Sequence, residues 1–210
     1  MVDIIMVTRR DVLKGGAAMM GAAILGACDG VWQPQSVAYI GASLTCRPVR
    51  GYHELGSSSN QLWPYYETGG GTVVEWIAPG SQYWLAFDQM HAANPIQRVW
   101  VMLCTRDDDY GGDLGLLRQQ ARTWLRQLRT RTDAPVYFSS MFEYLDQSCS
   151  SVTRSVGDTA TIRDELVAAG TVLPGPVLAP LDSTQLANGR CDQNELGQEV
   201  HGRQLQAFFG

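Results

Sequence analysis

Ser43 is the residue of this chain whose type and position best suit covalent chemistry. It follows the apolar run Val37–Ile40 and stands two residues after Gly41 in the stretch VAYIGASLTCRP. A serine hydroxyl reacts as a nucleophile only when a base of suitable pKa accepts its proton, and histidine is the usual base. The alternative is that Ser43 caps the helix after the first strand, since serine is favoured at that position. We interpret Ser43 as a residue that a strand end presents for chemistry.

Three histidines are available as partners for such a serine. His53 follows Ser43 in a stretch of loop-like composition and could fold over the site. His91 stands in an apolar-periodic stretch, which favours a packed or surface-edge role. His201 lies nine residues beyond Asp192, which is about 13 Å along a helix at 1.5 Å per residue. We therefore rank His53 first among the three.

The segments that must position these residues alternate between strands and helices. Apolar runs predict strands over 37–40, 98–104, 134–141 and 176–181, with a shorter aromatic strand before Gly70. Helical patterns begin near Thr72 and cover 117–128, 161–170 and 194–209, whereas Pro48 argues against a long regular helix directly after the first strand and 50–60 reads as a loop. Such alternation predicts an α/β fold with a mostly parallel sheet covered on both faces. Sites in such sheets lie at the carboxyl ends of strands.

Two of the expected helices are amphipathic. The helix over 117–128 carries a basic stripe opposite its apolar face, formed by Arg118, Arg122, Arg126 and Arg129. This stripe is either a solvated helix face or a surface for anionic lipid. The last helix offers Leu196, Val200, Leu205, Phe208 and Phe209 for its buried side.

Four short segments, taken in order, resemble the sequence blocks of the SGNH, or GDSL-type, hydrolases. They are Gly41-Ala42-Ser43-Leu44-Thr45, Gly70-Gly71-Thr72, Cys104-Thr105-Arg106-Asp107, and Cys191-Asp192-Gln193-Asn194 followed by Gly197. The resemblance covers nearly all of 37–210. It implies a three-layer α/β/α sandwich and hydrolysis of esters or carbohydrate esters. In that family the serine at the position of Ser43 is the nucleophile, and the amide at the position of Gly70 helps to bind the oxyanion.

The departures from this family concern the polar catalytic positions. Ala42 replaces an aspartate, Cys104 and Arg106 replace a glycine and an asparagine, and Asp192 stands where the catalytic histidine is expected. Arg106 offers several N–H donors that could face an oxyanion or an anionic ligand. A carboxylate is a weaker base than histidine unless burial raises its pKa.

Two functions follow from the resemblance. The first is a serine ester hydrolase for small acyl esters or acylated envelope carbohydrate, in which Ser43 attacks, Gly70 and Arg106 hold the oxyanion, and Asp192, with His53, moves the proton. The second is an inactive relative that binds an envelope ligand or partner. Neither function requires a cofactor. We expect no metal site, because the Asp107–Asp109 run lacks the spacing of a calcium loop and reads as a solvated acidic loop.

The N-terminus predicts export. TRRDVLKGGAAMMGAAILGAC joins an arginine pair to an apolar run that is too short for a stable membrane span. It resembles a twin-arginine lipoprotein signal over 1–27, with Cys28 as the lipidated residue, 28–36 as a tether and 37–210 as the domain. A plain secretory signal, or a buried helix, is the alternative. We expect a protein of the cell envelope that is anchored to the membrane through lipid on Cys28.

Charge and cysteine content narrow the function further. The net charge of −5 argues against a nucleic-acid partner. Lys14, the only lysine, lies in the predicted signal, so the domain over 37–210 has no lysine for chemistry. Four cysteines follow Cys28, an even number that suggests disulfides in an exported protein. We favour a Cys149–Cys191 pair, which leaves Cys46 and Cys104 as a second pair or as free thiols. We expect a monomer with a small-molecule or carbohydrate ester ligand.

Overall fold

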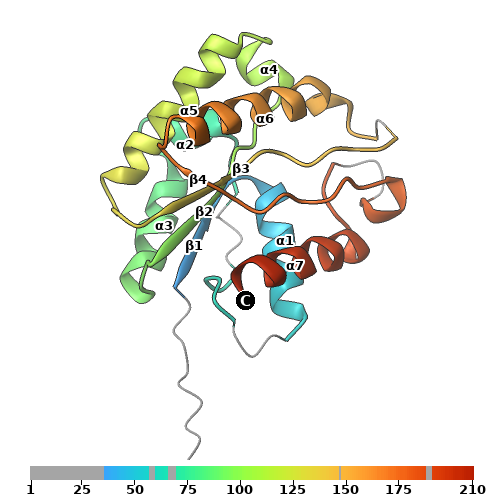
Figure 1. Cartoon of the computed structure of the whole chain (residues 1–210), viewed down its shortest axis with the longest axis horizontal. Helices are drawn as coiled ribbons and strands as arrows, with labels where there is room; N and C mark the ends of the chain where they lie inside the picture. Colours follow the sequence, from blue (N-terminus) through green and yellow to red (C-terminus); the bar gives the residue numbers. More distant parts are fainter. Residues whose placement is uncertain (1–35, 57–59, 66–69, 147, 188–190) are drawn as a thin grey trace, which may run out of the picture. The chain divides into compact units, whose positions relative to one another are not determined.

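Four short strands of the computed structural model form one sheet in which all neighbouring strands run parallel (Figure 1). They are β1 (Val37–Ile40), β2 (Arg98–Met102), β3 (Val136–Ser139) and β4 (Leu173–Pro174), arranged side by side in that order. The structure describes residues 36–56, 60–65, 70–146, 148–187 and 191–210, all within one compact unit. The α/β fold class and the parallel sheet expected from the sequence are confirmed.

β1 is flanked on both sides, and all four of its residues are fully buried. On one side Val37 pairs with Arg98 of β2. On the other side Leu62 forms an isolated parallel bridge with Val37, and Gly70 forms one with Gly41. The segment that follows α1 therefore lies along one side of β1, whereas β2 pairs with the other side, so the chain crosses from one side of β1 to the other. Ligand sites in α/β sheets lie at the carboxyl end of such a switch point.

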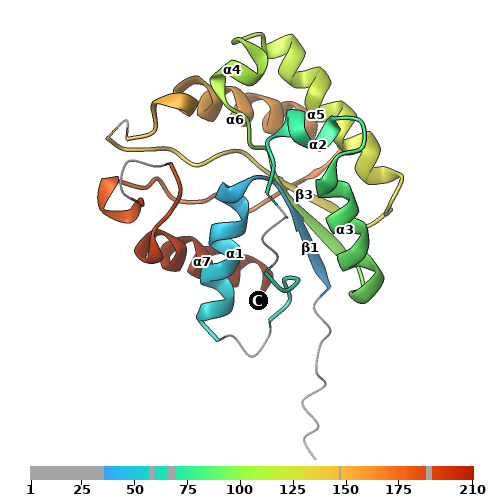
Figure 2. The same ribbon diagram turned by 180° about the vertical axis from the view of Figure 1, so that it is seen from behind.

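Helices lie on both sides of the sheet. They are α1 (Ser43–Glu54), α2 (Val73–Ile77), α3 (Gln82–Ala93), α4 (Asp107–Tyr110), α5 (Leu114–Arg129), α6 (Thr153–Ala168) and α7 (Glu195–Phe209), with the 3-10 turns η2 (Ser150–Val152) and η3 (Ser183–Gln185). Figures 1 and 2 show α1 and α7 together on one side, with α2, α3, α5 and α6 on the other. This arrangement is compatible with a three-layer sandwich.

Helix α1 corrects the prediction that Pro48 prevents a long helix after the first strand. The helix runs from Ser43 to Glu54 with Pro48 inside it, so residues 50–54 are helical rather than part of a loop. Proline removes one backbone hydrogen bond from a helix interior and destabilises it. Burial offsets this effect, because the side of α1 that includes Pro48 is buried.

Two glycines allow α1 and α7 to approach at backbone distance. A Cβ atom on Gly51 would overlap the carbonyl group of Gln198, and one on Gly202 would lie 2.5 Å from the Gly51 carbonyl carbon. Because neither residue has a side chain, the two helices pack directly against each other. This contact holds the last helix beside the one that carries Ser43.

The last strand differs from the prediction. β4 is Leu173–Pro174, and no strand forms over 176–181, where only Leu181 makes a bridge, with Tyr144. Pro176 and Pro180 have no N–H group to donate to a strand ladder, which excludes a regular strand over this segment.

The acidic run over 107–109 is also different from the prediction, because it forms part of α4 instead of a solvated loop. The carboxylate of Asp107 accepts hydrogen bonds from the backbone N–H groups of Arg154 (3.2 Å) and Ser155 (2.8 Å) in the first turn of α6. The Ser155 hydroxyl donates a third, at 2.6 Å. Burial acts to raise the pKa of Asp107, but the hydrogen bonds from Ser155 and Arg154 outweigh it, so this pKa lies below its usual value. Asp107 therefore joins α4 to α6.

The buried side of α7 agrees only partly with the expected one. Leu205 and Phe209 are buried and Val200 is half-buried, whereas Leu196 and Phe208 are 57% and 40% exposed. His201 of α7, which was not among the residues expected on the buried side, is fully buried.

The predicted Cys149–Cys191 disulfide is present. Cys46 and Cys104 are free and buried, so of the two alternatives for these cysteines the one with free thiols is confirmed.

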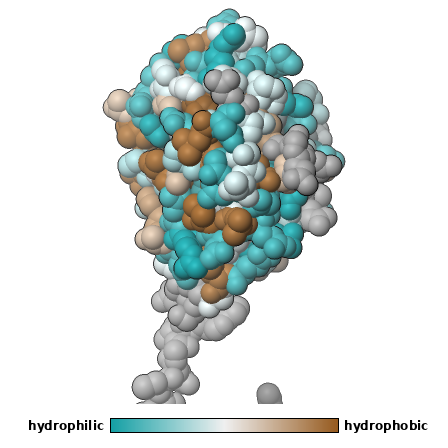
Figure 3. Space-filling model, turned by 90° about the vertical axis from the view of Figure 1, so that its right-hand side faces the viewer, coloured by the Kyte–Doolittle hydropathy of each residue, from teal (hydrophilic) through white to brown (hydrophobic). Residues whose placement is uncertain are grey.

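The face of the molecule shown in Figure 3 has small, separate groups of hydrophobic side chains among hydrophilic ones.

Candidate functional site

Ser43 is the first residue of α1, directly after the carboxyl end of β1. Ala42 occupies the N-cap position with an extended backbone, so the alternative in which Ser43 caps the helix is wrong. The Ser43 side chain is exposed and makes no hydrogen bond with any described residue. The first N–H groups of a helix lack intrahelical acceptors. Within the described residues, Ser43 therefore presents a hydroxyl without a hydrogen bond, and its backbone N–H belongs to the first turn of α1, where helix geometry supplies no acceptor.

A cavity of about 330 Å³ opens beside Ser43 at the carboxyl ends of the strands. Its walls are residues 42–44, 70–72, 104–106 and 191–192, together with Glu75, Tyr83, Met141, Ser151 and Val152. Four residues assigned to the site from the sequence, Ser43, Gly70, Arg106 and Asp192, thus line one cavity.

Gly70 contributes to this cavity through its lack of a side chain. A Cβ atom there would lie 2.8 Å from the Ser43 nitrogen, closer than van der Waals contact allows. The backbone after it is fixed, because Gly71 N–H donates to the Gly41 carbonyl at 2.7 Å. The position requires glycine, and this keeps the approach to the Ser43 N–H open.

Arg106 provides a cation at the edge of the cavity. Its side chain is 57% exposed, and the guanidinium Nε lies 3.8 Å from Asp109 Oδ1, a long and solvent-accessible ion pair. Its backbone N–H donates to Asp109 Oδ2 at 2.9 Å, which fixes the main chain while the guanidinium keeps donors to spare. An anionic or carbonyl oxygen in the cavity can accept from those donors.

Asp192 lies in the wall of the cavity and is partly exposed. Within the described part of the chain, its carboxylate makes no hydrogen bond or ion pair, whereas its backbone carbonyl accepts from Ala187 N–H at 2.8 Å. The disulfide of the preceding residue, Cys191, to Cys149 ties this segment to the region before α6. Asp192 thus carries a carboxylate with no partner among the described residues, directly after a disulfide-bonded cysteine.

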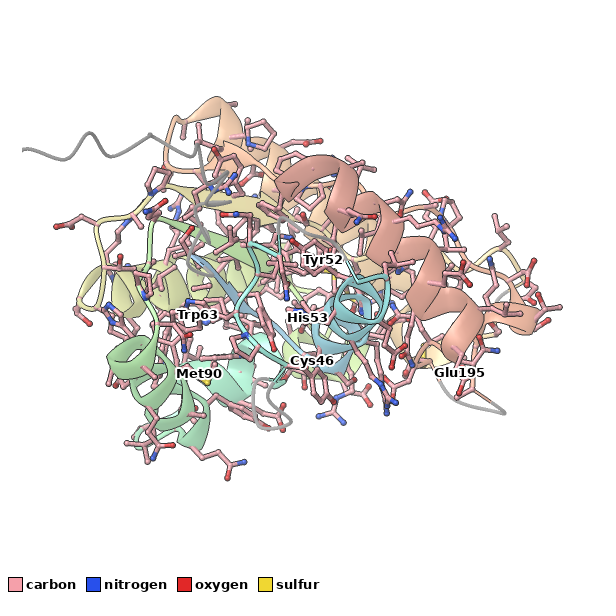
Figure 4. The ribbon with its side chains drawn as sticks, turned by 90° about the horizontal axis from the view of Figure 1, so that it is seen from below. Cys46, Tyr52, His53, Trp63, Met90 and Glu195 are labelled. Atoms are coloured by element: carbon pink, nitrogen blue, oxygen red, sulfur yellow. A yellow bond between two sulfur atoms is a disulfide. The ribbon has the colours of Figure 1, made fainter. Side chains whose placement is uncertain are left out.

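No histidine lines this cavity, and all three histidines of the chain lie in the described residues. His53, expected in a loop over the site, lies instead near the far end of α1, about 15 Å from Ser43 at 1.5 Å per residue. Its Nε2 lies 2.8 Å from the carbonyl oxygen of Trp63, and both residues can be followed in Figure 4. His53 is therefore placed where it cannot act on Ser43.

The other two histidines have structural surroundings. The ring of His91 stacks on the ring of Trp63, with 6.4 Å between their centroids. His201 is fully buried, with Nε2 2.8 Å from the Ala179 carbonyl oxygen and Nδ1 3.2 Å from the Gln193 amide nitrogen. Burial lowers the pKa of His201 to about 4, and the hydrogen bond to Ala179 opposes this effect only in part. His201 is a neutral core residue.

Cys104 lies in the wall of the cavity and is nearly fully buried. Burial raises its pKa to about 11, although hydrogen bonds from Ala42 and Thr45 act to lower it. Its Sγ lies 3.7 Å from Thr45 Oγ1. The thiol therefore fills space beneath the cavity and stays protonated at neutral pH.

The sequence did not indicate three polar residues of the cavity, Glu75, Tyr83 and Ser151, whereas Thr72 belongs to the Gly70-Gly71-Thr72 segment. The Thr72 hydroxyl is buried and has no partner among the described residues, while its backbone N–H donates to Glu75 Oε2 at 2.7 Å. Tyr83 packs against Gly71, where a Cβ atom would overlap its ring. The only signal in the sequence was the triple glycine beside them, which allows close approach.

The described residues contain no group of three or more His, Cys, Asp or Glu side chains that could hold a metal ion. Among them there is also no helix with the length and apolar composition of a membrane span. The predicted signal segment, Cys28 and the tether up to residue 35 lie outside the described residues. No protein-family model, curated protein or solved structure significantly matches this chain.

The cavity wall provides backbone hydrogen-bond donors, the guanidinium group of Arg106 and the carboxylates of Glu75 and Asp192, but no histidine that could act as a base. Backbone N–H groups and Arg106 can stabilise negative charge on an oxygen atom. Proton transfer from the Ser43 hydroxyl would depend on Asp192, because the other carboxylate of the wall, Glu75, is already bonded to Thr72 N–H. The arrangement can therefore stabilise an oxygen that carries negative charge, but it offers no histidine to activate Ser43.

Proposed function

We propose that this domain is an inactive relative of the SGNH, or GDSL-type, hydrolases with their three-layer α/β/α fold. In this proposal the Ser43 cavity binds a small acyl ester or an acylated envelope carbohydrate without histidine-assisted turnover. The observation that carries the proposal is that none of the three histidines lines the cavity. Because residues 1–27 resemble a twin-arginine lipoprotein signal, the proposal includes export and anchoring to the membrane through lipid on Cys28.

The chemistry of the cavity wall supports an oxygen-rich ligand. Ser43 and Ser151 bring hydroxyl groups to the cavity wall, and Glu75 and Asp192 bring carboxylates. Tyr83 and Met141 add apolar surface beside them. Small-molecule sites combine apolar walls with a few placed polar groups in this way.

A gain-of-function experiment tests this proposal. Asp192→His, combined with Arg106→Asn, restores the residue types of the family, and we expect it to hydrolyse p-nitrophenyl acetate in a Ser43-dependent manner. The parent protein should not do so. The matched control is Glu195→His, which adds a histidine at the exposed start of α7 but outside the cavity. A parent protein as active as the double variant would contradict the proposal.

A second candidate function is slow ester hydrolysis with Asp192 as the base. It is favoured by one observation, that Asp192 and the unbonded Ser43 line the same cavity. Ester turnover by the parent protein that disappears in both Ser43→Ala and Asp192→Asn would support this function over the first.

A further inference from the structure

A second cavity of this domain lies in a groove between α5 and α6. Its volume is about 490 Å³, and it shares no residue with the Ser43 cavity. The groove is lined from one side by α5, through Arg118, Arg122, Arg126 and Arg129. It is lined from the other by Glu165 and Leu166 of α6 and by Ala169, which directly follows that helix. The basic stripe seen in the sequence is thus the wall of a groove between two helices.

The arginines of this groove are only partly neutralised. Arg118 forms two hydrogen bonds with the Glu165 carboxylate, at 2.6 and 2.7 Å. Arg122, Arg126 and Arg129 have no carboxylate within 4.0 Å among the described residues. This leaves local positive charge on a chain whose net charge is −5.

The helix dipole explains only part of this arrangement. Cations in the last turn of a helix are stabilised by its partial negative charge, which accounts for Arg126 and Arg129. It does not account for Arg122, which lies near the middle of α5. Among the described residues Arg122 forms no side-chain hydrogen bond or ion pair, although its charge, after the stronger effect of Arg118, helps to lower the pKa of Glu165. Charge that is both local and unpaired favours an anion as the missing partner.

The floor of the groove is apolar. Leu125 of α5 and Leu166 of α6 are largely buried beneath it, and Ala169 adds a small exposed side chain. The aliphatic parts of arginine side chains extend such a surface while their charged ends remain in water. A simple anion would use the arginines but would leave this floor uncovered.

We propose that the groove between α5 and α6 binds an anionic amphiphile. The phosphate or carboxylate head lies against Arg122 and Arg126, and the alkyl chain covers Leu125 and Leu166. Charge complementarity selects the head, and the apolar floor selects the tail. This site is independent of the Ser43 cavity and does not require the function proposed for it.

Titration calorimetry of the full chain with dodecyl phosphate as monomer tests this proposal. We expect saturable binding that weakens with added salt, because exposed charges are screened. Arg122→Gln/Arg126→Gln should bind roughly tenfold or more weakly, as expected for the loss of charge-assisted hydrogen bonds. Glutamine preserves helix propensity, so thermal unfolding should show that this variant folds.

The matched control is Arg50→Gln/Arg203→Gln, which removes the same charge from exposed arginines paired with glutamates outside the groove. It should bind like the parent. Because every variant keeps the same N-terminus, amphiphile binding there affects all of them equally. Inorganic phosphate and dodecyl maltoside test the head and the tail separately, and both should bind much more weakly than dodecyl phosphate. The proposal would be overturned if Arg122→Gln/Arg126→Gln bound dodecyl phosphate as tightly as the parent. It would also be overturned if the parent bound inorganic phosphate or dodecyl maltoside as tightly as dodecyl phosphate.

Discussion

Gly70 lies so close to Ser43 that a Cβ atom at residue 70 would be 2.8 Å from the Ser43 nitrogen. It would also be 2.9 Å from the Ala42 carbonyl carbon, so the backbone itself would have to move. We expect Gly70→Ala to lower the free energy of unfolding by about 1–3 kcal/mol, as overpacked sites do. Urea unfolding measures this change. Gly157→Ala is the matched control, since α6 leaves open space there and alanine should stabilise the helix by about 0.5–1 kcal/mol. Equal effects of the two substitutions would contradict the close contact.

The Cys149–Cys191 disulfide closes a loop with a sequence separation of 42 and holds the segment that carries Asp192. In the chain-entropy description, a loop of this length corresponds to about 4 kcal/mol of stability. We expect Cys149→Ser/Cys191→Ser to lose stability of that order in urea unfolding. In the Asp192→His/Arg106→Asn background, the same change should also reduce esterase activity, because residue 192 loses its tether. Unchanged stability would show that the crosslink is dispensable.

Cys46 and Cys104 should resist thiol reagents while the protein is folded. Burial raises the pKa of Cys46 to about 12 and that of Cys104 to about 11, so neither forms the reactive thiolate near neutral pH. Alkylation followed by peptide mass spectrometry should find both residues unmodified in native protein and both modified in denaturant. Rapid modification of Cys104 in native protein would contradict the closed packing beneath the cavity.

His201 should make the protein less stable in acid. Its pKa is lowered from 6.5 to about 4 in the folded protein, mainly by burial. Between these pH values the unfolded chain binds more protons than the folded one, so the free energy of unfolding decreases as the pH falls. The expected loss is up to about 3 kcal/mol across this range.

Urea unfolding between pH 7 and pH 4 measures the contribution of His201. His201→Gln should be less stable at neutral pH and should lose this part of the pH dependence, whereas His53→Gln should keep it. The same slope in parent and His201→Gln would show that His201 is not the titrating group.

Much of this fold could be predicted from the sequence, because long periodic segments carry their own signal. The buried runs of β1, β2 and β3 and the apolar face of α5 are examples. Helix α1 was not predicted because Pro48 normally disfavours a helix, and its cause, burial of the side with Pro48 and packing of Gly51 against α7, is tertiary. The role of Asp107 was missed because its hydrogen-bond partners lie in α6, far away in the sequence.

The site was predictable in its residues but not in its chemistry. The resemblance to the four SGNH blocks predicted that Ser43, Gly70, Arg106 and Asp192 lie together, and all four line one cavity. Whether His53 reached them depended on the direction of α1, which no local pattern specifies. The polar contribution of Thr72 and Tyr83 likewise depends on tertiary packing.

The measurement that tests the central claim most directly is labelling of the folded protein with a fluorophosphonate probe. The claim is that Ser43 is exposed but not activated, because no histidine reaches it. The parent and Ser43→Ala proteins should show the same background, and Asp192→His/Arg106→Asn should gain a label that Ser43→Ala removes. Covalent labelling of the parent that disappears in Ser43→Ala would contradict the account and identify Ser43 as an active nucleophile.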